Sequence, residues 1–300
     1  MRSVKKRHFI TPILFALSLI LLLTIITYSY LKPTKNTTES ISSFGKQIIF
    51  KQYNKKGHIT HTLTTPRYLH YNRSNNSTAT NLTIKVETPD STSPWLINAD
   101  KGKNIYKQNK IIASGNVTGR QQKPLSQSQT VLRTSEVIYH TGNQNIECPF
   151  TNKISQYTKN YTTPTELITS QKATFYTIKQ ITKCENVSGV INVSKNPKSP
   201  NEWKIQAKQG EWIRHDNLIK FTGGVEFTHV NKKTSTVDMQ IQSPTLVYNT
   251  VTKIALCRDK TTIIQPGSTI TGQPISIDTI TQTLNNGRDI QGTYSSNSKP

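Results

Sequence analysis

Apolar and polar residues alternate with a period of two along most of the chain after its first forty residues. Residues 218–227 read LIKFTGGVEF, and their apolar side chains fall on every second position: Ile219, Phe221, Val225 and Phe227. This period is typical of a strand with one dry face and one wet face, so Lys220 and Glu226 are expected on the wet face. No amphipathic helix is expected between residues 44 and 296.

The same pattern of apolar, polar and glycine positions occurs twice in the sequence. Residues 202–227 (EWKIQAKQGEWIRHDNLIKFTGGVEF) repeat the outline of residues 94–119 (PWLINADKGKNIYKQNKIIASGNVTG) at a constant offset of 203 − 95 = 108 residues, without a gap. The matching pairs are Trp95 and Trp203, Ala99 and Ala207, Gly102 and Gly210, Gly115 and Gly223, and Val117 and Val225. Self-similarity of this kind predicts an array whose units bury their faces against their neighbours.

The repetition extends further along the chain. Residues 132–148 parallel residues 241–257, which places Cys148 against Cys257. We expect strands of roughly ten residues, joined by Asn-Gly, Gly-Asn, Pro-Gly or Asn-Asn-Gly turns. The expected organisation is a first repeat over residues 44–165 and a second over residues 166–296.

The N-terminus predicts a membrane anchor. A basic tip, residues 1–8, precedes an uncharged stretch of 23 residues, 9–31, which is long enough to span a bilayer. The stretch ends in TYSYLKP rather than in small residues, so an uncleaved anchor is favoured over a removed signal peptide. The positive-inside rule then places the tip in the cytoplasm and the chain after the linker, residues 32–43, outside it.

The charge balance predicts an anionic partner. Lys and Arg number 38 against 16 Asp and Glu, a surplus of 22. Nucleic acid, a membrane surface and a phosphorylated ligand all fit such a surplus. The lysines are scattered, they are not interleaved with aromatic residues, and the domain is expected outside the cytoplasm, so nucleic acid is not expected. A phosphorylated lipid is the favoured anion.

No catalytic or metal-binding motif is found. His58 and His61 are three residues apart, which places them on opposite faces of a strand, and the acidic residues are never paired for acid–base work. Neither enzyme activity nor a cofactor or metal is expected. Three cysteines leave open one oxidised pair or, the favoured interpretation, small buried strand residues. Several N-x-[ST] sequons, Asn116 and Asn186 among them, leave a type II glycoprotein as an alternative.

These motifs, in this order, resemble the LptC family of lipopolysaccharide export proteins. A basic tip and one span are followed by strands of the types W-x-I-x-A-x-x-G, G-G-V-x-F and I-x-S-P-T-L-x-Y, and residues 257–294 resemble the family's ending. Family members are usually about two-thirds of this length. The additional repeat of about 100 residues resembles the related LptA/OstA fold.

The resemblance implies an all-β fold, a β-jellyroll of two facing antiparallel sheets, duplicated after one transmembrane helix. It implies an inner-membrane protein with its bulk in the periplasm, which accepts lipopolysaccharide from the permeases of the Lpt ABC transporter. The lipid passes to a periplasmic LptA-like protein docked at the C-terminal edge. The expected lipid-binding groove is lined by Trp95, Ile97, Ile111, Ala113, Val117, Trp203, Ile205, Ile219, Phe221, Val225 and Phe227. The alternative is an anchored β-solenoid scaffold or adhesin that binds proteins without lipid.

Overall fold

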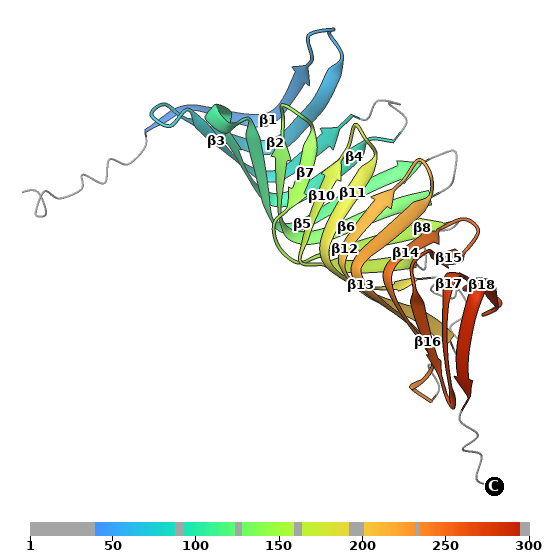
Figure 1. The fold of residues 1–300 in the computed structure, drawn as a ribbon. Helices are drawn as coiled ribbons and strands as arrows, with labels where there is room; N and C mark the ends of the chain where they lie inside the picture. The colour runs from blue at the N-terminus through green and yellow to red at the C-terminus, as the bar shows by residue number, and fades with distance from the viewer. Residues whose placement is uncertain are drawn as a thin grey trace, which may run out of the picture. The chain divides into compact units, whose positions relative to one another are not determined.

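The computed structural model describes residues 40–87, 93–123, 128–158, 164–191, 201–231 and 234–294, which fold almost entirely into β-strands (Figure 1). These residues contain eighteen strands and one short 3-10 helix, with no helix long and apolar enough to cross a membrane. The expected anchor, residues 9–31, lies outside the described residues. The prediction of an all-β fold is confirmed.

The strands follow one another along the chain with short connections. The first nine are β1 (Ile41–Tyr53), β2 (Ile59–Tyr71), β3 (Asn76–Val86), β4 (Trp95–Ile105), β5 (Lys110–Lys123), β6 (Ser128–His140), β7 (Asn145–Cys148), β8 (Asn152–Thr158) and β9 (Pro164–Ser170), with the 3-10 helix η1 (Tyr106–Gln108) between β4 and β5. The other nine are β10 (Lys172–Tyr176), β11 (Ile181–Ile191), β12 (Asn201–Ile213), β13 (Leu218–Asn231), β14 (Thr236–Asn249), β15 (Ile254–Cys257), β16 (Thr261–Gln265), β17 (Ser268–Asp278) and β18 (Leu284–Tyr294).

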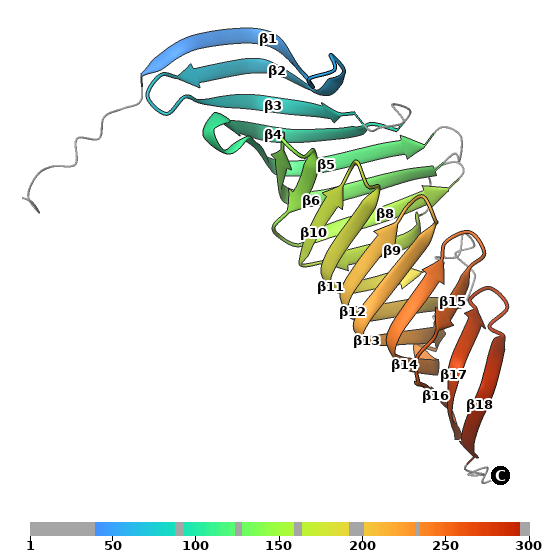
Figure 2. The same cartoon turned by 45° about the horizontal axis from the view of Figure 1, so that its top comes forward.

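All the strands belong to one antiparallel meander that is folded over on itself (Figure 2). Four long strands each pair with two short ones: β6 with β7 and β8, β11 with β9 and β10, and both β14 and β17 with β15 and β16. Each of these short pairs is therefore one strand that is broken at its bend. The bend divides the folded sheet into two halves that face each other. The half that contains β7, β10 and β15 is called the first half here, and the half that contains β8, β9 and β16 is called the second half. The two facing sheets expected from the sequence are thus the halves of a single sheet.

The line along which the sheet folds, called the crease here, crosses the long strands near their midpoints. Asn81, Asn116 and Asn186 have φ angles of 48°, 47° and 50°, in the left-handed region that asparagine tolerates better than most residues. Gly223 and Gly224 serve the same purpose in β13, with φ angles of 86° and 84°. The pairing register of β5 and β13 shifts at these points, as in a β-bulge, which bends a strand.

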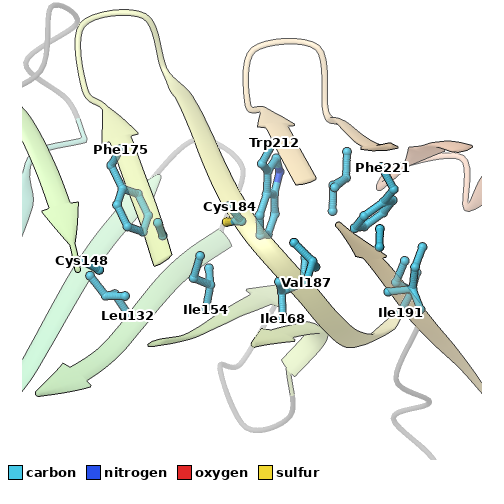
Figure 3. Packing of buried hydrophobic residues seen from close by; sticks show 14 of the residues in the cluster. Leu132, Cys148, Ile154, Ile168, Phe175, Cys184, Val187, Ile191, Trp212 and Phe221 are labelled. Atoms are coloured by element: carbon cyan, nitrogen blue, oxygen red, sulfur yellow. The ribbon is translucent and has the colours of Figure 1, made fainter. Parts of the chain in front are cut away.

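The core lies between the two halves. Figure 3 shows Phe175 and Trp212, from first-half segments, together with Ile154 and Ile168 from the second half, filling the space between them. Thirty-eight buried hydrophobic residues, from β3 to β17, form one cluster within the described residues. The apolar interior is therefore continuous along the meander.

The turn chemistry expected from the sequence is partly wrong. Gly142-Asn143 and Pro266-Gly267 lie in turns, as expected. Residues 285–287 (Asn-Asn-Gly) lie within β18 and not in a turn. Gly115-Asn116 lies within β5, as its strand motif predicts, and the positive φ angles of the two residues bend the strand there.

The three cysteines are free and buried. The interpretation as small buried strand residues is confirmed, and the alternative of an oxidised pair is wrong for this structure. Burial raises the pKa of the Cys184 thiol to about 11, so this thiol stays protonated and unreactive at neutral pH.

Candidate functional site

All the residues expected to line a groove face the interior between the two halves. None of them is more than 3 % exposed, and all belong to the one hydrophobic cluster: Trp95, Ile97, Ile111, Ala113, Val117, Trp203, Ile205, Ile219, Phe221, Val225 and Phe227. Lys220 and Glu226, which alternate with them on β13, are exposed. The alternation in the sequence thus separates the inside of the folded sheet from its outside.

Aromatic side chains pack closely in this interior. Trp203 stacks on Phe227 with ring centroids 4.4 Å apart, and Trp95 meets Phe175 edge-on at 5.0 Å. Each such ring buries a large apolar area and adds a favourable ring–ring contact. Trp203 and Phe227 lie on neighbouring strands of one half, whereas Trp95 and Phe175 come from opposite halves, so the two halves contact each other directly through side chains.

Several interior residues were missed by the sequence reasoning. Leu82, Ile84 and Val86 of β3 are buried, as is Phe175 of β10. The alternation of NLTIKV, residues 81–86, is a signal that could have identified the β3 residues. Phe175 lies in a strand of only five residues, which is too short for a convincing period.

A cavity of about 240 Å³ opens in the interior near the N-terminal end of the meander. Apolar side chains from β1 to β5 line most of it, among them Phe50, Leu63, Ala79 and Leu82. Whole small ligands occupy roughly 300–1,000 Å³, so this space suits one apolar segment of a larger ligand.

The side of the folded sheet opposite the crease, called the mouth here, is where the hairpin ends of the two halves meet. Among the described residues, four polar contacts cross the mouth, and each joins residues more than 70 positions apart. They are His61 Nδ1 with Tyr139 Oη at 3.3 Å, Arg214 with Gln121, Lys253 Nζ with Glu166 Oε1 at 2.7 Å, and Trp203 Nε1 with the Thr279 carbonyl oxygen at 2.9 Å. These contacts hold the mouth closed over the apolar interior.

The histidine at the mouth is held neutral. His61 is 2 % exposed, and its contacts are the hydroxyls of Thr60 and Tyr139. Burial lowers the pKa of His61 to about 4, because the charged imidazolium loses its hydration there. His58 is exposed, so the two histidines do not act together, and the described residues contain no group of three or more His, Cys, Asp or Glu side chains that could hold a metal ion.

The outer face and the two edge strands differ from the interior. Lys101, Lys153, Lys183 and Lys220 are exposed on the outer face, in keeping with the net charge of +22. In the described part of the chain, β1 pairs only with β2 and β18 only with β17. Each edge strand therefore offers free backbone groups along one side.

A sheet that is folded around a continuous apolar interior and has a free edge at each end defines a β-jellyroll protein of the kind that can shield apolar chains. The family described as "Lipopolysaccharide-assembly, LptC-related" matches residues 12–162 and again residues 152–295, so the chain belongs to this family. Membership supports a role in lipopolysaccharide transport through a periplasmic bridge, with LptA-like proteins among the partners. The family's members are bridge proteins and are not known as enzymes.

Among solved structures, the chain is similar to LptH, described as the LptA homologous periplasmic component of the conserved lipopolysaccharide transport device from Pseudomonas aeruginosa. The identity is 13 %, the match covers 67 % of this chain and 95 % of that chain, and the TM-score is 0.18, too low to extend the description of the fold. No curated protein matches the chain.

Proposed function

We propose that the chain is an inner-membrane-anchored periplasmic carrier. It accepts lipopolysaccharide from the permeases of the Lpt ABC transporter and passes it to an LptA-like periplasmic protein. The observation that carries this proposal is the single apolar cluster that runs from β3 to β17 between the halves of the folded sheet. Such an interior provides an unbroken apolar path for acyl chains.

The interior must open to receive its cargo. The expected lining residues contact one another in the closed state, so acyl chains enter as the halves separate and replace these side-chain contacts. The exchange is nearly neutral in free energy, because both states keep the same apolar surface out of water. The cavity near β1 is already open to a first segment of chain.

The edge strands are the proposed docking surfaces. The C-terminal edge, near residues 270–294, pairs with the LptA-like protein by strand addition, which uses the free backbone groups of β18. The N-terminal edge, β1, faces the transporter. Exposed apolar side chains on β1, such as Phe44 at 52 % and Ile49 at 65 %, suit such a contact.

We propose that the chain after the linker consists of two repeats, residues 44–165 and 166–296. The two family matches, which overlap at residues 152–162, support this division. The hydrogen bonding between β8 and β9 and the hydrogen bond between Arg214 and Gln121 both join the two repeats, which implies that neither repeat is an independent unit.

The anchor is residues 9–31, with residues 1–8 in the cytoplasm. A reporter that fluoresces only in the cytoplasm, fused after Pro300, is expected to stay dark. A bright fusion, or a mature protein that lacks residues 1–30, contradicts the anchor.

The lipid path is tested by photo-crosslinking in cells at two adjacent positions of β13. A photo-reactive residue at position 221, where Phe221 is fully buried, is expected to capture lipopolysaccharide. The same residue at position 220, where Lys220 is exposed, is the matched control and is expected to capture little. Equal capture at the two positions excludes an interior path.

The dry packing of the interior also fits a second candidate, an anchored scaffold or adhesin that binds proteins through its edges. It predicts no lipid crosslink at position 221 or at Ile205, which is 1 % exposed. Lipid captured at both interior positions excludes this candidate.

A further inference from the structure

One positive charge lies buried at the mouth. Arg214 follows β12 and is 7 % exposed. Its guanidinium donates to Gln121 Oε1 and, over 2.8 Å, to Thr182 Oγ1. The same group lies 5.0 Å from the ring centroid of Trp95 and 5.7 Å from that of Phe175.

In the part of the chain that the structure describes, no acidic side chain compensates this charge. Among the described residues no Asp or Glu lies within ion-pair distance of Arg214, and both of its hydrogen-bond partners are neutral. A guanidinium has five N–H donors, and two are used here. Burial lowers the pKa of Arg214 to about 10, so the group is still charged at neutral pH. A buried charge without a counter-charge lowers stability, and an anion bound beside it would supply that counter-charge.

The space beside Arg214 suits an anion. A cavity of about 370 Å³ lies at the mouth and is lined by Arg214 together with the polar residues Ser128, Thr130, Gln156, Asn217 and Thr250. The hydroxyl of Thr130 already donates to Gln156 Oε1 and that of Thr250 to the Asn217 carbonyl oxygen, so Arg214 is the main donor of the cavity. The carboxylate in its lining, Glu166, is paired with Lys253 Nζ at 2.7 Å. Because the charges of Glu166 and Lys253 cancel, Arg214 gives the cavity a net positive charge. The indole Nε1 of Trp95, beneath the guanidinium, is buried without an acceptor.

We propose that this mouth cavity binds a phosphate group, with the Arg214 guanidinium as its main ligand. The inference rests on the proposed function: a phosphorylated lipid whose acyl chains enter the interior would leave its head group at the mouth. Guanidinium and phosphate match in geometry and charge, and charge-assisted hydrogen bonds are stronger than neutral ones. The same chemistry would also take free inorganic phosphate, so the two sources are tested separately.

The test uses the purified full chain in detergent. Dissociation constants are measured for bisphosphorylated lipid A and for the same lipid after enzymatic removal of both phosphates. We expect the wild type to bind the phosphorylated form at least about tenfold more tightly. Arg214→Met is expected to remove most of this preference while still binding the dephosphorylated lipid. Arg133→Met, on the exposed outer face of β6, is the matched control and is expected to keep the preference.

A thermal melt separates the site from a structural role. Removal of the uncompensated charge offsets the loss of the hydrogen bonds to Gln121 and Thr182, so Arg214→Met is expected to melt close to the wild type in the absence of ligand. A variant that melts well below the wild type and keeps the phosphate preference overturns the proposal. Should Arg214→Met fail to fold, Arg214→Lys decides: the proposal requires a several-fold smaller preference, and an unchanged preference overturns it.

The remaining outcomes assign the source of the phosphate. In one outcome, inorganic phosphate raises the melting temperature of the wild type but not of Arg214→Met, and the wild type binds the two lipids equally well. This outcome assigns the site to free phosphate and not to a lipid head group. Equal affinity of the wild type for both lipids, with no effect of phosphate, overturns the site but leaves the carrier function standing. Failure to bind either lipid contradicts the carrier function itself.

Discussion

At the scale of single residues, the crease explains a sequence pattern that resembles a modification signal. Asn81, Asn116 and Asn186 each bend a strand, and each is followed by a buried apolar residue and then by Thr or Ser. The side chain of Asn116 donates to Asp100 Oδ2 over 2.8 Å, and that of Asn186 donates to Gln171 Oε1 over 2.7 Å. These sequons therefore follow from the backbone conformation of a bent strand.

Two neighbouring glycines test the crease directly. In Gly223→Ala the new Cβ atom would lie 2.8 Å from Lys208 Cβ at a φ of 86°, whereas in Gly224→Ala it meets nothing within 4 Å at a φ of 84°. The positive φ alone costs about 1–2 kcal/mol in each variant. We expect Gly223→Ala to lose more unfolding free energy in a urea titration. Equal losses would mean that the bend accommodates the contact.

His61 gives the protein an acid sensitivity. Its pKa is about 4 in the folded chain and about 6.5 when unfolded, so between these values the unfolded state binds more protons and stability falls as the pH falls. We expect this group to account for about 2.5 kcal/mol of lost unfolding free energy between pH 7.5 and pH 4.5. In His61→Gln the loss over this range should be smaller by that amount. The same pH dependence in both proteins would contradict the buried neutral imidazole.

At the scale of the strands, the sequence predicts which residues face inward, whereas it does not predict the contacts that close the mouth. Alternation identified the inward residues of β4, β5, β12 and β13, because burial on one face is a local property. The repeat in the sequence correctly paired Gly115 with Gly223, which both have positive φ angles at the crease. It did not predict the bend itself, because a flat strand and a bent strand show the same alternation of apolar and polar residues. The contact of Arg214 with Gln121 spans 93 positions and depends on how the halves meet, so no local pattern encodes it.

The ion pair between Glu166 of β9 and Lys253 before β15 ties the halves together. Glu166 is 1 % exposed and lies 2.7 Å from Lys253 Nζ. Lys253→Met leaves a buried carboxylate without its partner and is expected to cost about 3–5 kcal/mol in denaturant unfolding. The double variant Glu166→Gln, Lys253→Met should recover most of this loss, because no charge is then left buried. A double variant as unstable as the single one would show that the pair itself stabilises the mouth.

At the scale of the whole molecule, a continuous interior predicts that a block in the middle separates its two ends. Ala173 of β10 is 1 % exposed, and Ala173→Trp places a large ring between the halves, at a packing cost of about 1–3 kcal/mol. Photo-crosslinking to lipid is expected to persist at Ala79, in the N-terminal cavity, and to disappear at Ile277 of β17. Thr174→Trp, on the opposite face of the same strand, is the control and should leave both crosslinks. A crosslink at Ile277 in Ala173→Trp would mean that lipid bypasses β10.

The spacing of the crease residues shows how a chain of this kind can change its length. Asn116 lies 116 − 81 = 35 positions after Asn81, and Asn186 lies 186 − 116 = 70 positions, or two such steps, after Asn116. One step is a single bent hairpin, so the 108-residue offset corresponds to about three hairpins. Each hairpin widens the sheet by two strands, or about 10 Å. Gain or loss of whole hairpins keeps every strand's direction, its inward face and both edges, so the distance between the two edges can evolve in steps of about 10 Å without a new fold.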